Sequence, residues 1–209
     1  MKLERKGQAV SVVGQVAAPS NFNIASSRIA FNILSSGLYN DKIRAVIREL
    51  ACNAYDAHVA AGKKDQPFEI HLPTSFEPFF TIKDSGTGLR YTKGGCKPCG
   101  GKGKVNGEVC PKCDGTGDYD AVKALYCTYF SSDKNDSNDF IGAMGLGSKS
   151  PFCYCEGFTV INRYNGVTRI YSAFISEHGT PAVVMQDETE TPDAANGVEV
   201  TFPVKQSDC

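Results

Sequence analysis

The fold is decided by the stretch RELACNAYDAH, residues 48–58. It lies inside a segment from Asn40 to Ala61 in which apolar residues recur at spacings of three and four, and Gly62 follows. This spacing places the apolar residues on one side of a helix, and a glycine commonly ends a helix in the left-handed conformation. The sequence therefore predicts a helix that packs one face on a sheet. Its recurring apolar residues are Ile43, Val46, Ile47, Leu50, Ala54 and Ala57.

The same helix carries a polar stripe of Glu49, Asn53 and Asp56, at positions i, i+4 and i+7. At 3.6 residues per turn, these three side chains fall within an arc of about 60° beside a cleft. A carboxylate such as Glu49 can polarise water, and the carbonyl oxygen of Asn53 suits a hard cation such as Mg²⁺. When the stripe is taken alone, a solvated helix face with a few acids is the more ordinary explanation.

Two strands are predicted downstream of the helix, at residues 68–72 and 79–84, and a glycine turn follows the second. Asp84 stands at the end of that strand, close to Gly86 and Gly88. A carboxylate in this position suits the amino group of a purine, and glycines allow the backbone to approach a ring closely. The turn is therefore a candidate binding element.

A glycine-rich segment at residues 142–150 reads GAMGLGSKS. Glycine amides followed by a hydroxyl and a cation are the ingredients of a backbone phosphate cradle. The polar run before it, residues 131–138, predicts a loop. Taken singly, each glycine pattern is more often a turn than a site. The candidate phosphate-binding residues are Gly142, Gly145, Leu146, Gly147, Ser148 and Lys149.

The last third of the chain alternates short apolar runs with turns such as Asn165-Gly166. The runs predict consecutive strands of an antiparallel sheet, and residues 121–126 predict a helix before them. Helices followed by such a sheet make α+β the predicted fold class. Cys153 and Cys155 are expected to alternate along a strand. The predicted strands cover residues 157–161, 167–174, 182–185 and 197–202.

Composition excludes several classes of protein. The 209 residues include 22 Lys and Arg against 23 Asp and Glu, a net charge of −1. A protein that binds nucleic acid over its whole surface needs an excess of positive charge, so only a local basic patch remains open. No apolar run approaches the roughly 20 residues of a membrane span, and no secretory leader is evident. We therefore expect a cytoplasmic protein.

Nine cysteines are present, and four of them form two copies of C-x-x-C-x-G-x-G. Each C-x-x-C turn directs two thiolates at one point, so the spacing C-x₂-C-x₁₀-C-x₂-C predicts a tetrahedral Cys₄ zinc site. Residues 92–119, which surround it, have almost no core-forming side chains and read as an insert that needs the metal to fold. The insert is explained equally well as a structural element that stabilises a loop and as a zinc knuckle that contacts a partner. The predicted zinc ligands are Cys96, Cys99, Cys110 and Cys113.

Taken in order, these motifs resemble the GHKL ATPase superfamily, which includes DNA gyrase B, MutL, the ninety-kilodalton heat-shock chaperone and histidine kinases. The longer runs FNILSSGLY (31–39), RELACNAYDAH and GLGSKSPF (145–152) are more particularly similar to RIIA-like proteins of large tailed bacteriophages. The cysteine repeats look like those of the DnaJ cysteine-rich region, which has four copies rather than two. Apart from the insert, the likeness covers nearly the whole chain.

The resemblance implies a Bergerat fold, a two-layer sandwich with a mixed, mostly antiparallel sheet, in which residues 1–209 form one ATP-binding domain interrupted by the insert. It implies that Glu49 is the general base, that Asn53 is the Mg²⁺ ligand and that Asp84 binds the adenine amino group. Gly86 and Gly88 would make room for the nucleotide, and Asp56 would belong to the same site. The phosphates would meet the glycine-rich segment under a mobile lid at about residues 128–147, with Lys149 as a charge partner.

Two departures from the family bear on ATP hydrolysis. Gly197 is followed by Val198 rather than threonine, so a hydroxyl that assists the adenine-binding Asp is missing or is supplied by Thr201. The chain ends at Cys209, before the transducer domain from which relatives receive a lysine. We therefore expect Mg²⁺-dependent ATP binding with slow hydrolysis and, when nucleotide orders the lid, closure as a homodimer. The alternatives are a non-enzymatic module that binds a host or phage protein through the zinc knuckle, and a DNA-associated GHKL protein.

Overall fold

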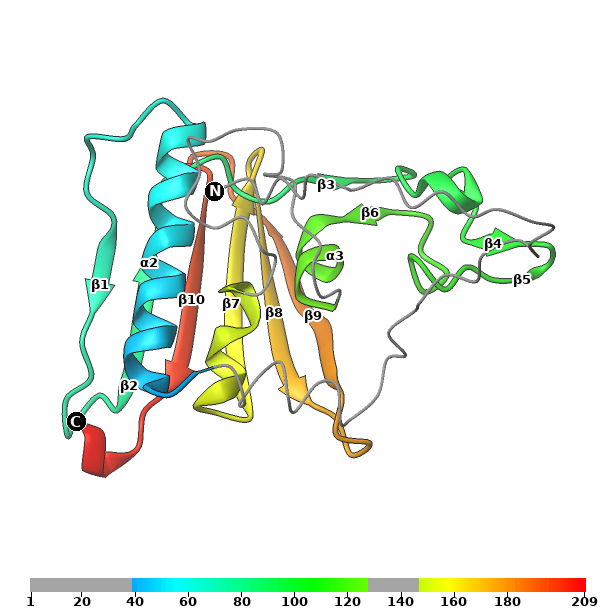
Figure 1. Ribbon diagram of the computed structural model, residues 1–209. Helices are drawn as coiled ribbons and strands as arrows, with labels where there is room; N and C mark the ends of the chain where they lie inside the picture. Colours follow the sequence, from blue (N-terminus) through cyan, green and yellow to red (C-terminus); the bar gives the residue numbers. More distant parts are fainter. Residues whose placement is uncertain (1–38, 128–146) are drawn as a thin grey trace, which may run out of the picture.

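The computed structural model describes residues 39–127 and 147–209, which fold as an α+β protein with a sheet covered on one face by helices (Figure 1). The main sheet has six strands in the order β1-β2-β10-β7-β8-β9, and every pairing is antiparallel. The predicted α+β class and two-layer sandwich are confirmed. The strands are β1 Glu69–His71, β2 Phe79–Lys83, β7 Gly157–Tyr164, β8 Val167–Ile175, β9 Pro181–Glu190 and β10 Gly197–Pro203.

The long helix α2, Lys42–Ala60, is the element predicted from the apolar spacing. Asp41 caps its first turn by accepting a hydrogen bond from the Arg44 amide at 3.0 Å. Gly62 follows the last turn with a φ of 71°, the left-handed conformation that ends helices. The buried face carries Val46, Leu50 and Ala54. The apolar face is narrower than the sequence predicts, because Ile43 is 48% exposed and Ile47 is 38% exposed.

The core lies between the sheet and the three helical segments that cover it, α2, α3 Ala121–Cys127 and η2 Gly147–Cys153. Alternate residues of β2, β7, β8 and β10 point into this layer, and each buried valine or phenylalanine contributes about 1.5–3 kcal/mol. The intervening residues lie on the other face, where the hydroxyls of Thr81 and Thr201 approach to 2.8 Å. The large buried strand residues include Phe80, Ile82, Phe158, Val160, Tyr171, Val200 and Phe202.

Tight turns set the register of the long hairpins. Asn165 and Gly166 join β7 to β8 with φ angles of 50° and 73°, the type I′ geometry that matches the twist of the strands. Between β8 and β9 the pairing shifts at Ile170/Tyr171, where an extra residue makes a bulge. The hairpin turn predicted at Asn165-Gly166 is confirmed.

The segment before β7 differs from the prediction. Cys153 ends the 3₁₀ helix η2 and Cys155 lies in the turn after it, so neither cysteine is on a strand. The amides of Tyr154 and Cys155 both bond to the carbonyl of Pro151, at 2.9 Å, which closes a helical turn instead of extending the chain. A last 3₁₀ helix, η3, spans Gln206–Asp208. None of the helices in residues 39–127 and 147–209 is long and apolar enough to cross a membrane.

The cysteine-containing segment leaves the sheet domain and returns to it at one place. Strand β3, Tyr91–Thr92, pairs with β6, Tyr119–Asp120, and Thr92 lies opposite Tyr119. Between them are the 3₁₀ helix η1, Lys97–Cys99, and a hairpin of β4, Lys104–Val105, and β5, Glu108–Val109. Figure 1 shows this hairpin well beyond the edge strand β9. We call residues 93–118 the knuckle.

Candidate functional site

The polar stripe of α2 meets the start of η2. A Cβ atom placed on Gly147 would lie 2.8 Å from Oε2 of Glu49 and 3.5 Å from Nδ2 of Asn53. The other carboxylate oxygen of Glu49, Oε1, accepts a hydrogen bond from Arg48 at 2.8 Å. The fold therefore brings the predicted base, the predicted Mg²⁺ ligand and the first described residue of the glycine-rich segment together.

Asp56, the third member of the stripe, differs from Glu49 in its surroundings. Its side chain is fully buried, whereas Glu49 remains partly exposed. The 60° arc of the stripe is wide enough for its two edges to face different surroundings. The place of Asp56 in the nucleotide site stays a prediction.

The turn after β2 rests directly on α2. Asp84 is buried, and its Oδ1 accepts a hydrogen bond from the Gly86 amide at 2.8 Å, which closes a tight local turn. A Cβ on Gly86 would lie 2.6 Å from the Cβ of Ala57. Because Ala57 is one helical turn beyond Asn53, the predicted adenine turn and the predicted Mg²⁺ ligand lie along one side of the same helix.

Two further glycines allow the turn to pack into the sheet. A Cβ on Gly88, whose φ is 68°, would lie 2.4 Å from the carbonyl oxygen of Arg163. A Cβ on Gly197 would lie 2.0 Å from the carbonyl oxygen of Asp84. Protein backbone therefore occupies the space that a side chain at either of these two positions would fill. This packing explains the glycines at both positions without a ligand.

The hydroxyl predicted to assist Asp84 is not supplied by Thr201. Thr201 bonds to Thr81 on the face of the sheet opposite α2, because its neighbours Val200 and Phe202 point into the core. Asp84 instead approaches β10 through its backbone, where its amide donates to the carbonyl of Val198 at 2.9 Å.

Lys149 is a buried cation in η2. Only 2% of its surface is exposed, and burial lowers the pKa of its ammonium group to about 8. Its neighbour Ser148 places a hydroxyl oxygen 3.4 Å from Nζ. The predicted phosphate-binding residues Gly142, Gly145 and Leu146 and the predicted lid, apart from Gly147, lie outside the described residues.

Three side chains that fix the Asp84 turn were not predicted from the sequence. His58 is 1% exposed, and its ring accepts a hydrogen bond from the Ser85 amide. Lys63 donates a hydrogen bond to the Ser85 carbonyl. Asn162 of β7 both accepts from and donates to the backbone of Leu89, at 2.8 Å each. No local pattern marks these residues, because each contact joins segments far apart in the sequence or across a loop.

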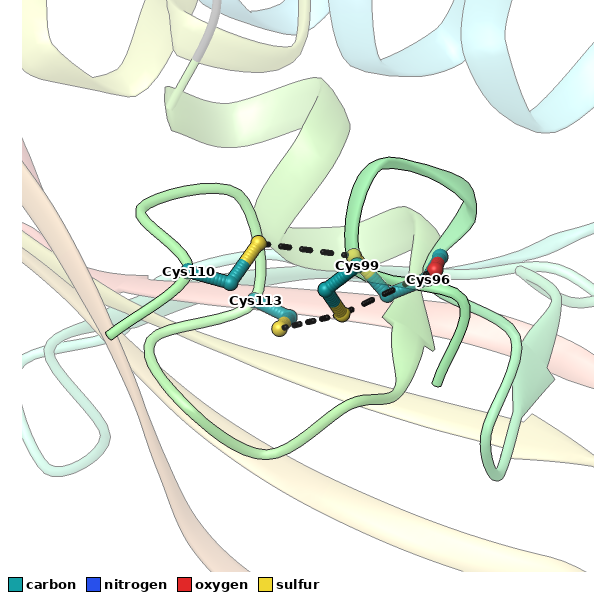
Figure 2. Close-up of side chains that lie close together, drawn as sticks. All are labelled: Cys96, Cys99, Cys110 and Cys113. Atoms are coloured by element: carbon teal, nitrogen blue, oxygen red, sulfur yellow. Dashed lines mark hydrogen bonds between the residues drawn. The ribbon is translucent and has the colours of Figure 1, made fainter. Parts of the chain in front are cut away.

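The four cysteines of the two repeats converge in the knuckle (Figure 2). Their sulfur atoms all lie within 4.8 Å of one another, with Cys96 and Cys110 at 3.9 Å and Cys99 and Cys113 at 3.7 Å. Sulfurs at 2.3 Å from a tetrahedral zinc are separated by about 3.8 Å. Burial raises the pKa of the Cys96 thiol, and a bound cation would favour its thiolate form. The geometry and the chemistry of the donor set both fit zinc.

Equivalent positions of the repeats make equivalent contacts. A Cβ on Gly103 would lie 2.1 Å from the Gly115 carbonyl, and a Cβ on Gly117 would lie 2.2 Å from the Gly101 carbonyl. The amides of Cys96 and Cys110 likewise donate to the carbonyls of Gly117 and Gly103, both at 2.9 Å. The knuckle thus has an approximate twofold symmetry, and its glycines permit the two turns to approach closely.

Strands β3 and β6 form the neck of the knuckle, and Tyr91 of β3 anchors this neck to the sheet. Its hydroxyl donates to Asp118, the residue before β6, and burial raises its pKa and keeps it protonated. The Arg169 guanidinium of β8 lies 3.8 Å above the Tyr91 ring and donates to Glu188 of β9 at 2.7 Å. Asp120 of β6 accepts from the amide of Val122 and so caps α3. The neck therefore connects the knuckle to both the sheet and α3.

No protein-family model matches the sequence, and no curated protein matches it either. Among solved structures, the fold is similar to the ATPase region of Saccharomyces cerevisiae topoisomerase II, with a TM-score of 0.52, and to the same region bound to ICRF-187 (dexrazoxane), with a TM-score of 0.53. In both cases the identity is 13% over 78% of this chain, and the chain spans 38% of the other. The chain therefore shares its fold with that ATPase region.

Proposed function

We propose that the chain is a nucleotide-binding module that binds ATP together with Mg²⁺ along one side of α2. The observation that carries the proposal is the convergence of three separate motifs on that helix. Gly147 lies against Glu49 and Asn53, and the Asp84 turn lies against Ala57. A fold shared with the ATPase region of topoisomerase II supports the same assignment.

The chemistry of each residue gives it a role. The carbonyl oxygen of Asn53 is a ligand for Mg²⁺, which when bound neutralises phosphate charge. Oε2 of Glu49 is the general base for water, while Arg48 holds Oε1 and so limits the rotation of the carboxylate. Asp84 accepts from the adenine amino group through its carboxylate.

The phosphates belong at the start of η2. Amides at Gly147 and Ser148 and the buried ammonium of Lys149 provide donors there, and Gly142, Gly145 and Leu146 extend the cradle in the sequence. In this proposal, hydrolysis is slow and nucleotide closes the lid and favours a homodimer. The finer resemblance to phage RIIA-like proteins is part of the proposal, and it rests on the three sequence runs that carry it.

The knuckle holds zinc through its four cysteines in this proposal. Zinc supplies the folding free energy that its small core lacks, because the buried core of the knuckle consists of the cysteines themselves. With all four tetrahedral positions filled by sulfur, the metal has no open position for catalysis. The zinc is therefore structural.

Isothermal titration with a non-hydrolysable ATP analogue and Mg²⁺ tests the main proposal. We expect saturable binding that Mg²⁺ strengthens. Glu49→Ala should retain binding and lose ATP turnover, whereas Glu177→Ala, which removes an exposed carboxylate from a turn, should change neither. No binding by the unmodified protein would overturn the proposal, and equal turnover in Glu49→Ala would overturn the role of Glu49.

A non-enzymatic binding module is the second candidate function, and the exposed knuckle favours it. The hairpin lies beyond the sheet and exposes Val105 and Val109 (Figure 1). Its charge does not favour nucleic acid as the partner. Five lysines, three acids and the −2 charge of a zinc tetrathiolate sum to 5 − 3 − 2 = 0 for residues 93–118. A protein partner suits this surface better, and nucleotide binding without turnover would support this function.

A further inference from the structure

His58 uses both of its ring nitrogens inside the protein. Nδ1 lies 3.0 Å from the carbonyl oxygen of Gln66, and Nε2 lies 2.9 Å from the amide nitrogen of Ser85. A carbonyl can only accept and an amide N–H can only donate, so Nδ1 carries the proton and Nε2 is the acceptor. The ring also meets the edge of Phe68, with centroids 6.3 Å apart. Its partners therefore select the neutral Nδ1–H form.

Ser85 connects this histidine to the candidate adenine turn. It follows Asp84, and its carbonyl accepts from Lys63 at 2.8 Å, so the C-terminal end of α2 and the loop after it hold both backbone polar groups of one residue. The far end of the turn is fixed to β7, because Asn162 binds both backbone groups of Leu89. The turn is thus held between the helix and the sheet, and His58 is one of the side chains that hold it.

We propose that His58 is a positioning residue of the nucleotide site, which as a neutral imidazole fixes the Asp84 turn against the helix that carries Glu49 and Asn53. This inference rests on the proposed function. It assigns no contact between His58 and nucleotide, because the ring acts through Ser85. The distance between the adenine-binding carboxylate and the Mg²⁺ ligand then depends on the His58–Ser85 hydrogen bond.

Protonation of His58 breaks this bond. The charged ring carries a proton on both nitrogens, which places the Nε2–H donor against the Ser85 N–H donor. The turn then loses one of its attachments to α2, and nucleotide affinity falls on acidification. The other charged groups at this contact are Lys63, which binds Ser85, Asp84, which precedes it, and Asp56 on the same helix.

Two substitutions at His58 distinguish the effect of its hydrogen bond to Ser85 from the effect of its charge. In His58→Gln the side-chain amide still offers an oxygen to Ser85 and an N–H to Gln66, but it does not titrate. His58→Phe removes the hydrogen bonds to Ser85 and to Gln66 and keeps a ring. His178→Gln is the matched control, because that histidine is exposed in the β8–β9 turn. Each protein is titrated with a non-hydrolysable ATP analogue and Mg²⁺ from about pH 8 to about pH 5.5, the range in which histidine changes charge.

At about pH 8 we expect His58→Gln to bind the analogue within about threefold of the unmodified protein, and His58→Phe to bind roughly tenfold more weakly, since the buried Ser85 amide loses its acceptor. On acidification the unmodified protein and His178→Gln should lose affinity more steeply than His58→Gln. The analogue also titrates in this range, but it does so equally for every variant, so the difference between the profiles isolates His58.

Nitrogen NMR of the histidine rings tests the His58–Ser85 hydrogen bond directly, while the pH profiles of nucleotide affinity supply the readout that a purely structural role would not change. We expect His58 to be the Nδ1–H tautomer at about pH 8, and the Ser85 amide resonance to move as the ring titrates. The Nε2–H tautomer, or parallel pH profiles for the unmodified protein and His58→Gln, would overturn the inference. If His58→Phe fails to fold, His58→Gln and the NMR measurement still decide it.

The experiment distinguishes this inference from the proposal on which it rests. If the unmodified protein binds no analogue at any pH, the nucleotide-binding function is wrong, and the role of His58 is overturned with it. If the unmodified protein binds and His58→Gln follows the same pH profile, only the role of His58 is wrong.

Discussion

The helix-and-sheet domain and the knuckle hold their loops in different ways. In the domain, a continuous core of aliphatic and aromatic side chains lies between α2 and the sheet, and the Asp84 turn is fastened to that scaffold by polar contacts. In the knuckle, the buried cluster contains only four cysteines. The comparison shows that apolar burial positions the candidate nucleotide site, whereas a cluster of four cysteine side chains forms the centre of the knuckle.

The two regions are joined through the neck and not through a shared core. Tyr91, Asp118 and Arg169 connect them by hydrogen bonding and by stacking of a guanidinium on a ring. Such contacts fix orientation but add less stability than a buried apolar layer does. The two regions should therefore respond independently to the loss of a metal and to the loss of a core side chain.

The largest expected effect is the loss of the metal. Cys110→Ser should reduce bound zinc from one ion to none and unfold the knuckle, because zinc supplies on the order of 10 kcal/mol in small zinc modules. Hydrogen exchange should show lost protection in residues 93–118 and unchanged protection in β7 and β8. Cys209→Ser, at an exposed cysteine, is the control. Loss of protection across the sheet would contradict the separation of the two regions.

A cavity in the main core should destabilise the helix-and-sheet domain and leave zinc binding by the knuckle unchanged. Leu50→Ala removes a buried side chain of α2 and should lower the free energy of unfolding by about 2–5 kcal/mol. Ile43→Ala on the exposed face of the same helix should change it by less than about 0.5 kcal/mol. Denaturant unfolding measures both values, and zinc content should stay at one ion per chain. Zinc loss in Leu50→Ala would show that the knuckle depends on the core.

The smallest expected effect concerns the buried cation beside the phosphate segment. The pKa of Lys149 is lowered to about 8, so raising the pH from about 7 to about 9 removes its charge in the free protein. Nucleotide affinity should then fall up to about tenfold, since the phosphates lose a cation. Lys149→Met should bind more weakly at pH 7 and show no such fall in isothermal titration.

The same lowered pKa affects stability in a defined direction. The unfolded chain holds the lysine proton more tightly than the folded chain does. The contribution of Lys149 to the free energy of unfolding therefore rises as the pH increases from about 8 toward 10.5, and it is lost as the pH falls through 8. Equal pH dependence of unfolding in Lys149→Met would contradict the assignment of this pKa to Lys149.

Much of the fold was predictable because its signals are local. The spacing of apolar residues gave α2, alternation gave the strands, and Asn-Gly gave the type I′ turn. The predictions failed where tertiary packing overrode a local pattern. Cys153 lies in η2 rather than on a strand, and Thr201 faces away from the Asp84 turn.

The residues of the candidate site were predictable from the sequence, but their arrangement in space was not. Glu49 and Asn53 share a helix face by spacing alone, whereas their proximity to Gly147 depends on how η2 packs on α2. The roles of Gly88 and Gly197 are visible only in the folded chain, where backbone carbonyls occupy the place of their side chains. His58 has no sequence signature, because its partner Ser85 is 27 residues away.

By itself, the sequence determined the helix with its polar stripe, the antiparallel sheet and the four cysteines with metal-ligand spacing. These features depend on residue periodicity and on short covalent separations, which the chain fixes before it folds. The tertiary structure alone decided which polar side chains are buried and which meet across the fold. Those contacts form only when the register of the sheet and the packing of α2 bring distant segments together.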